Sequence, residues 1–126
     1  MRILIMEDNA SVRKLMVSLL GRVADDIRER GDGVDAVAAY AQHRPDWVLM
    51  DITMGDVDGL TETRRIKTAF PEARIIIVTN LNDRELKEAA REAGACYYVL
   101  KQDLFTLPEL LLRRSHWLTG NQTSQQ

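Results

Sequence analysis

The segment Ile3-Leu4-Ile5-Met6-Glu7-Asp8 places four apolar residues directly before two acids. A short, continuous apolar run of this kind is typical of a strand that is covered on both faces of a parallel sheet. Residues 12–23 then carry apolar side chains at helical spacing. We therefore predict a strand followed by a helix, with Glu7 and Asp8 at the carboxyl end of the strand.

The same alternation of a short apolar run and an amphipathic segment recurs along the chain. The predicted strands cover residues 3–6, 27–30, 47–50, 74–78 and 96–100, and the predicted helices cover residues 12–23, 33–43, 60–70, 82–94 and 106–118. The second strand is polar and short, which suits the edge of a sheet. Five strands that alternate with five helices imply one parallel sheet with helices on both faces, joined by right-handed crossovers. The expected fold class is α/β, with a doubly wound sheet.

Several helix starts can be predicted from capping residues. Asp58 precedes the third predicted helix and is expected to start it. Asn82 with Glu85, and Thr106 with Glu109, have the spacing of a capping box. We expect these two pairs to start the fourth and fifth helices.

Length and composition restrict the class of protein. The chain has 126 residues, of which 45% are hydrophobic and 29% charged, and its formal net charge is −2. This suits a single globular domain, and the charge gives no reason to expect attraction to nucleic acid or membranes. The single cysteine, Cys96, excludes an internal disulfide and fits a reducing compartment. No apolar run is long enough to span a bilayer, and the acids at positions 7 and 8 come too early for a signal peptide. We expect a soluble, cytoplasmic protein.

Charged residues follow three of the predicted strands. Glu7 and Asp8 follow the first strand, Asp51 follows the third, and Lys101 follows the fifth. Because the carboxyl ends of parallel strands gather along one edge, where ligands usually bind, we expect these side chains to lie close together. Neighbouring carboxylates repel one another, and a hard dication such as Mg²⁺ relieves that repulsion. A lysine suits phosphate, so the pattern predicts a divalent-cation and phosphoryl site.

Taken together and in order, five pieces of the sequence resemble the receiver domain of bacterial two-component response regulators. They are Glu7-Asp8, residues 32–36, residues 51–59, Val78-Thr79 and residues 98–101. The resemblance extends from Arg2 to about Leu118, which implies a receiver domain at residues 1–118 and leaves a polar C-terminal tail at residues 119–126. It also implies the flavodoxin-like (βα)5 fold with strand order 2-1-3-4-5, which sequence spacing alone does not show.

The resemblance implies a role for each acid at this edge. Asp51 would be the phosphoacceptor, since a carboxylate can attack phosphorus and form an acyl phosphate. Asp8 and Asp51 would bind Mg²⁺ directly, the backbone carbonyl of Thr53 would add a ligand, and Glu7 would act through water. A role for Asp8 or Asn9 in capping the first helix is compatible with this, because capping and metal binding occur at the same corner.

The resemblance also implies a switch. Lys101 would pair with Asp51 at rest and with the phosphoryl oxygens afterwards. In the family, a hydroxyl at the position of Thr79 hydrogen-bonds the new phosphoryl group and draws the following loop inward. Tyr98 would change rotamer as that space empties, although packing as a core aromatic is an open alternative. Tyr97 would point to the opposite face of a regular strand.

Three residues depart from the family pattern. Gly55 replaces the usual proline, so greater flexibility is expected in the loop after the third strand. Gln102 also replaces a common proline, which makes a cis bond there much rarer. Asn80 stands where a very small residue is usual, and with Leu81 it could shield the acyl phosphate from water. We therefore expect slow self-hydrolysis.

The resemblance implies signalling by phosphorylation. A histidine kinase, a phosphotransfer protein or a small phosphodonor would transfer a phosphoryl group to Asp51, while Mg²⁺ and Lys101 neutralise the developing charge. Such a domain promotes its own phosphorylation and dephosphorylation and is not a conventional enzyme. Its conformational change would be passed to a downstream protein effector from the fourth helix, fifth strand and fifth helix. We expect no direct nucleic-acid or membrane contact. The sequence does not decide whether the chain forms a homodimer through its last helix.

One alternative is a receiver-like interaction module that works without phosphorylation, which Asn80 and Gln102 keep open. Two other classes fit less well. A phosphatase with an aspartate nucleophile usually has a second acid two residues later, where this chain has Thr53. A flavin-binding protein of similar fold would need a loop of small residues for phosphate, where residues 7–10 are acidic.

Overall fold

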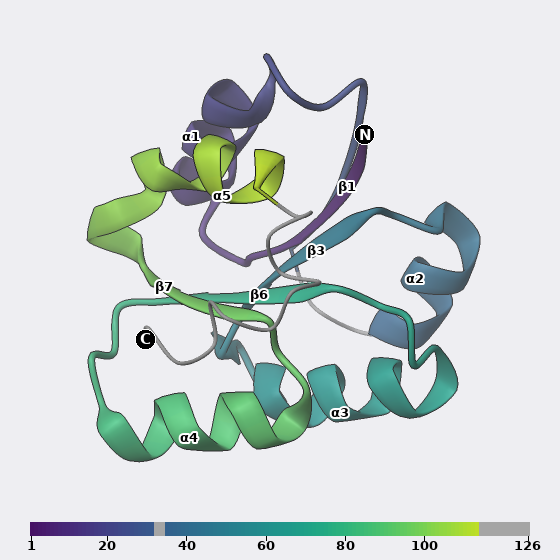
Figure 1. The fold of residues 1–126 in the computed structure, drawn as a ribbon, viewed down its shortest axis with the longest axis vertical. Coiled ribbons are helices and arrows are strands. Elements are labelled where there is room, and N and C mark those ends of the chain that lie inside the picture. The colour runs from purple at the N-terminus through teal and green to yellow at the C-terminus, as the bar shows by residue number, and fades with distance from the viewer. Residues whose placement is uncertain (32–34, 114–126) are drawn as a thin grey trace.

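The computed structural model describes residues 1–31 and 35–113, and its centre is a parallel five-stranded sheet (Figure 1). The strands are β1 (Arg2–Met6), β2 (Asp26–Arg30), β3 (Trp47–Asp51), β6 (Ile75–Thr79) and β7 (Tyr97–Leu100). Their order is β2-β1-β3-β6-β7, and every neighbouring pair is parallel. Since β6 and β7 are the fourth and fifth strands of this sheet, the predicted order 2-1-3-4-5 is confirmed.

The five α-helices of the described residues cover the two faces of the sheet (Figure 1). They are α1 (Ala10–Leu20), α2 (Ala36–His43), α3 (Gly59–Ala69), α4 (Arg84–Ala93) and α5 (Leu107–Leu112). Helices α1 and α5 pack on one face, and α2, α3 and α4 pack on the other. The predicted continuation of the last helix to Leu118 and the polar tail at residues 119–126 lie outside the described residues.

The central strands are buried on both faces, as the continuous apolar runs predict. In β1, Ile3 and Ile5 pack in the layer of α1 and α5, whereas Leu4 and Met6 pack in the layer of α2 and α3. These four side chains are at most 1% exposed. Each contributes about 1.5–3 kcal/mol relative to an exposed position, so the core fixes the strand register and with it the position of the residues that follow each strand.

The first and third helices begin at capping residues that the sequence predicted. Asn9 caps α1, because its side chain accepts a hydrogen bond from the Val12 amide at 3.0 Å. Asp58 caps α3 by accepting from the Leu60 amide at 3.0 Å. The second helix begins at Ala36, later than the predicted residue 33.

The two capping-box predictions were wrong. Asp83, and not Asn82, caps α4, since its carboxylate accepts hydrogen bonds from the amides of Glu85 and Leu86. The Thr106 side chain makes no capping bond to α5 and donates instead to the backbone carbonyl of Asp103 at 2.7 Å. A 3₁₀ helix, η1 (Lys101–Thr106), leads directly into α5 and supplies this competing acceptor.

A small hairpin between β3 and α3 was not predicted. Its strands are β4 (Thr53–Met54) and β5 (Val57–Asp58), which pair in antiparallel fashion. Gly55 and Asp56 form the connecting loop, and Gly55 has φ +57°. The hairpin places this loop beside the carboxyl end of the sheet. Among residues 1–31 and 35–113, no helix has the length and apolar character needed to cross a bilayer.

Candidate functional site

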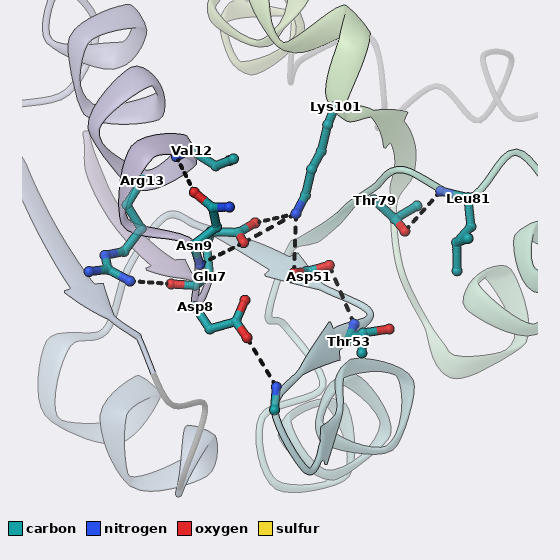
Figure 2. Close-up of polar contacts among 11 residues, drawn as sticks. Glu7, Asp8, Asn9, Val12, Arg13, Asp51, Thr53, Thr79, Leu81 and Lys101 are labelled. Carbon is teal, nitrogen blue, oxygen red and sulfur yellow. Dashed lines mark hydrogen bonds and ion pairs between the residues drawn. The ribbon is translucent and has the colours of Figure 1, made fainter.

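The carboxyl ends of β1, β3 and β7 bring four charged side chains together. Glu7 and Asp8 follow β1, Asp51 ends β3, and Lys101 follows β7. One carboxylate oxygen from each of the three acids can be chosen so that the three atoms lie within 4.8 Å of one another. Figure 2 shows these side chains converging on one corner. The predicted gathering of these residues is present, and three hard oxygen donors at this spacing could hold a cation such as Mg²⁺.

Lys101 bridges two of the acids. Its Nζ lies 3.3 Å from Oδ2 of Asp51, and 3.0 and 3.1 Å from the two carboxylate oxygens of Glu7. The pairing with Asp51 was predicted, but the closer pairing with Glu7 was not. Burial alone lowers the pKa of the Lys101 ammonium, but the bond to Glu7 and the charges of Asp51 and Glu7 outweigh it and raise the pKa. Lys101 is therefore a fixed positive charge.

Glu7 is fully buried and only partly compensated. Burial raises the pKa of its carboxyl, the Asn9 amide and Lys101 oppose this rise, and the negative charge of Asp51 adds to it. The Asn9 amide donates to Oε2 at 3.1 Å, while Oε1 has the Lys101 ion pair at 3.0 Å and accepts no further hydrogen bond from any described residue. Arg13 holds the backbone here by donating to the Glu7 carbonyl at 2.7 Å. An incompletely satisfied buried carboxylate favours a further cation at this corner.

Asp51 is held by the start of the hairpin and by α3. Its Oδ1 accepts a hydrogen bond from the Thr53 amide at 3.3 Å, and its side chain is 7% exposed. The Gly59 amide donates to the Ile52 carbonyl at 2.6 Å. A Cβ atom at position 59 would lie 1.9 Å from the Asp51 carbonyl oxygen, so only glycine allows this approach. The N-terminus of α3 therefore packs directly on the backbone that carries Asp51.

Asp8 is the most exposed of the three acids and contacts the hairpin loop. Its Oδ2 accepts a hydrogen bond from the Gly55 amide at 3.1 Å. We predicted greater flexibility at Gly55 and did not predict this hydrogen bond to Asp8. Only the departure from the usual proline could have suggested it, because proline has no N–H to donate.

Thr79 and Tyr98 are linked through the backbone of one residue. Thr79 is 2% exposed, and its hydroxyl oxygen accepts from the Leu81 amide at 3.2 Å. The Tyr98 hydroxyl donates to the Leu81 carbonyl. Figure 2 shows that Thr79 lies on the side of the loop after β6 that faces Asp51. Tyr98 is half-buried against the layer of α3 and α4, whereas Tyr97 packs in the opposite layer, as predicted. The sequence did not indicate that the Leu81 backbone contacts both residues.

The other two departures lie at the rim of this site. Asn80 is exposed at the end of β6, and Leu81 is 46% exposed. Gln102 is exposed within η1, and no described residue is joined by a cis peptide bond. Among the described residues, neither the Asn80 side chain nor the Gln102 side chain forms a hydrogen bond with the acidic cluster.

The sequence is similar to signalling proteins of known family. It is 36% identical over 101 residues to the chemotaxis protein CheY of Bacillus subtilis, covering 79% of this chain and 84% of that protein. It is also 36% identical over 124 residues to the transcriptional regulatory protein PdtaR of Mycobacterium tuberculosis, covering 94% of this chain. The aligned part is 60% of PdtaR, so this chain spans less than two thirds of that relative.

A solved structure supports the same relationship. The CheX-CheY-BeF3-Mg²⁺ complex from Borrelia burgdorferi contains a chain with a TM-score of 0.74 and 27% identity, and the match covers 79% of this chain and 76% of that one. The family model for the response regulator receiver domain matches residues 3–112. The resemblance inferred from the five sequence pieces is thus confirmed, and this chain belongs to the response regulator receiver domains of two-component signalling systems.

Proposed function

We propose that this chain is a phosphorylation switch in which Asp51 accepts the phosphoryl group. The observation that carries the proposal is the position of Asp51: its Oδ2 lies 3.3 Å from Lys101 Nζ, in an acidic cluster with Glu7 and Asp8. Receiver domains are signalling domains, so the chemistry proposed is a single modification of the protein itself and not turnover of a small-molecule substrate. The proposed donors are the phosphohistidine of a histidine kinase or phosphotransfer protein, or a small phosphodonor.

The donor set fits Mg²⁺. Three carboxylates face one ammonium, which leaves a local excess of negative charge, and all candidate ligands are hard oxygen atoms. Asp8 and Asp51 would bind the ion directly, with the Thr53 carbonyl as a further ligand and Glu7 acting through water. When bound, Mg²⁺ supplies positive charge beside the transferring phosphoryl group. The solved relative from Borrelia, whose complex includes Mg²⁺ and BeF3, supports this assignment.

The transfer itself uses Asp51 as the nucleophile. A carboxylate oxygen of Asp51 forms a new O–P bond, and the bond between phosphorus and the donor nitrogen or oxygen breaks. The leaving group takes the electron pair of that bond. Lys101 is already within 3.3 Å of Asp51 and stays charged, so it stabilises negative charge on the phosphoryl oxygens without moving far.

The response would pass through Thr79, Leu81 and Tyr98. A phosphoryl group on Asp51 carries about −1.5 to −2 charges at pH 7 and offers a stronger acceptor to the Thr79 hydroxyl. The bond from the Leu81 amide to Thr79 would then be remodelled, and the bond from Tyr98 to the Leu81 carbonyl would carry the change to β7. The proposed output is a population shift on the face of α4, β7 and α5, read by a downstream protein effector.

Intact mass spectrometry tests the proposal. The protein is incubated with Mg²⁺ and acetyl phosphate, and with a cognate kinase where one is found. We expect one added phosphoryl group, lost in D51N and lost when the cation is removed with EDTA. If neither donor modifies the wild-type protein while the fold is intact, the phosphorylation-independent interaction module is the better reading.

A further inference from the structure

The contact between Asp8 and Gly55 joins two parts of the site that are 47 residues apart in sequence. The Gly55 amide donates to Oδ2 of Asp8 at 3.1 Å. In Figure 2 this bond turns one oxygen of Asp8 toward the hairpin and leaves the other free of it. A carboxylate has two oxygens and about four lone-pair directions, so Asp8 can accept this bond and still offer an oxygen to a cation.

Glycine at position 55 makes this bond possible for two reasons. Its φ of +57° belongs to the left-handed region, which suits the first residue of a two-residue hairpin loop. It also has a backbone N–H. Proline, which is usual at this position in receiver domains, has φ fixed near −65° and no N–H. A chain with proline here cannot form the bond that this chain forms.

We propose that the Gly55 amide is a positioning group for the cation site, which orients the Asp8 carboxylate so that its second oxygen faces Glu7 and Asp51. The inference rests on the proposed function, since it concerns the affinity of the same site for Mg²⁺. Hydrogen bonds that orient a metal-binding side chain typically change metal affinity by 10–100-fold. Asp8 gains most from such a bond, because it is the exposed acid of the cluster, whereas Glu7 and Asp51 are buried.

Mg²⁺ titration by isothermal calorimetry tests the inference in three proteins: wild type, G55P and G55N. G55P removes both the N–H and the positive φ. G55N is the matched control, because asparagine keeps the N–H and visits the left-handed region more readily than most residues. A Cβ at position 55 has no neighbouring atom within 4 Å, so the added side chain meets open space. We expect the Kd for Mg²⁺ to rise about tenfold or more in G55P and to change less than about threefold in G55N.

Three outcomes overturn the inference. If wild type and G55P bind Mg²⁺ equally, the amide does not position Asp8. If G55N loses as much affinity as G55P, the side-chain replacement and not the lost N–H weakens binding. If wild type binds no Mg²⁺, the proposed function fails as well, so the two failures are distinguishable.

Amide hydrogen exchange in the wild-type protein keeps the test decisive if G55P does not fold. We expect the Gly55 amide to exchange more slowly than the Asp56 amide in the same exposed loop, and to lose this protection in D8A. Equal exchange of the two amides in the wild-type protein would contradict the hydrogen bond itself.

Discussion

At the scale of single residues, Gly59 determines how closely α3 approaches Asp51, the proposed phosphoacceptor. A Cβ at this position would overlap the Asp51 carbonyl oxygen at 1.9 Å, and the nearby atoms are backbone that cannot rotate away. We predict that G59A destabilises the fold by about 1–3 kcal/mol, as overpacking of a core does. Urea unfolding measures the change.

Gly21 provides the matched control for this prediction. It follows α1 with a helical φ of −60°, and a Cβ there would meet carbonyl oxygens at 3.5 Å or beyond. G21A should therefore be neutral or more stable by about 0.4–1 kcal/mol, because alanine restricts the unfolded chain. A G59A protein as stable as G21A would mean that α3 can move away from Asp51 without cost.

Lys101 compensates two acids, so its removal should cost more than the loss of one surface ion pair. K101M leaves Glu7, at 0% exposure, and Asp51 without their shared cation. Breaking a buried ion pair from one side typically costs about 3–5 kcal/mol. We expect a loss near the lower end of that range, since Lys101 is 15% exposed.

The double variant E7Q/K101M distinguishes charge from packing. Removing the buried Glu7 charge together with its partner should restore part of the stability lost in K101M, because the uncompensated carboxylate is then absent. Urea midpoints of the wild type, both single variants and the double variant give the coupling energy. A double variant no more stable than K101M would show that packing of the lysine stem, and not its charge, was lost.

At the scale of elements, we expect His43 to make the packing of the end of α2 on β1 depend on pH. The side chain is 4% exposed, and its Nε2 lies 3.3 Å from the Ile3 carbonyl, so the neutral ring with Nε2–H donates into β1. Burial lowers the pKa of His43, while the charge of Asp26 opposes this. Because the pKa of His43 is lower in the folded state, the unfolded chain takes up a proton first as the pH falls. The stability contributed by neutral His43 is therefore fully present above the unfolded-state pKa and is lost as the pH falls from there through the folded-state pKa.

We therefore predict that the wild-type protein loses stability below about pH 6.5 more steeply than H43Q. Glutamine can donate to the Ile3 carbonyl but does not titrate in this range. Thermal unfolding followed between pH 8 and pH 5 measures both profiles. Parallel profiles would exclude His43 as the source of the pH dependence.

The elements also show which parts of the structure could be predicted from sequence. Apart from the polar edge strand β2, the strands of the main sheet were predictable because apolar runs such as residues 47–50 are long enough to bury both faces. The hairpin at residues 53–58 was not, because strands of two residues have no periodicity to detect. Asn82 and Asp83 are both good caps, and only the backbone conformation at Asp83 selects it.

The candidate site also has a part that could be predicted from sequence and a part that could not. The gathering of Glu7, Asp8, Asp51 and Lys101 follows from strand direction, which sequence can predict. The second partner of Lys101 depends on the side-chain conformation of a buried glutamate, which no pattern encodes. The contact of Gly55 with Asp8 depends on the unpredicted hairpin, so it too became visible only in three dimensions.

At the scale of the whole molecule, cation binding and folding should be linked. The three acids come from β1 and β3 and meet only in the folded sheet, so the unfolded chain has no comparable site. A ligand that binds only the folded state stabilises it by RT ln(1 + [L]/Kd), which is about 2.7 kcal/mol at 100 times the Kd. We predict that saturating Mg²⁺ raises the urea midpoint of the wild-type protein.

The acidic cluster offers its own test of where this stabilisation arises. D8N removes one proposed ligand, and D51N removes the other, which is also the proposed phosphoacceptor, so each should remove most of the gain from Mg²⁺. D56N is the control, because Asp56 is an exposed acid of the hairpin loop outside the cluster. Its Mg²⁺-dependent gain should equal that of the wild type. If all three variants respond equally, Mg²⁺ screens surface charge in general, since diffuse screening does not depend on which acid is removed. If only the two cluster variants lose the response, the strand ends of the folded sheet create the site.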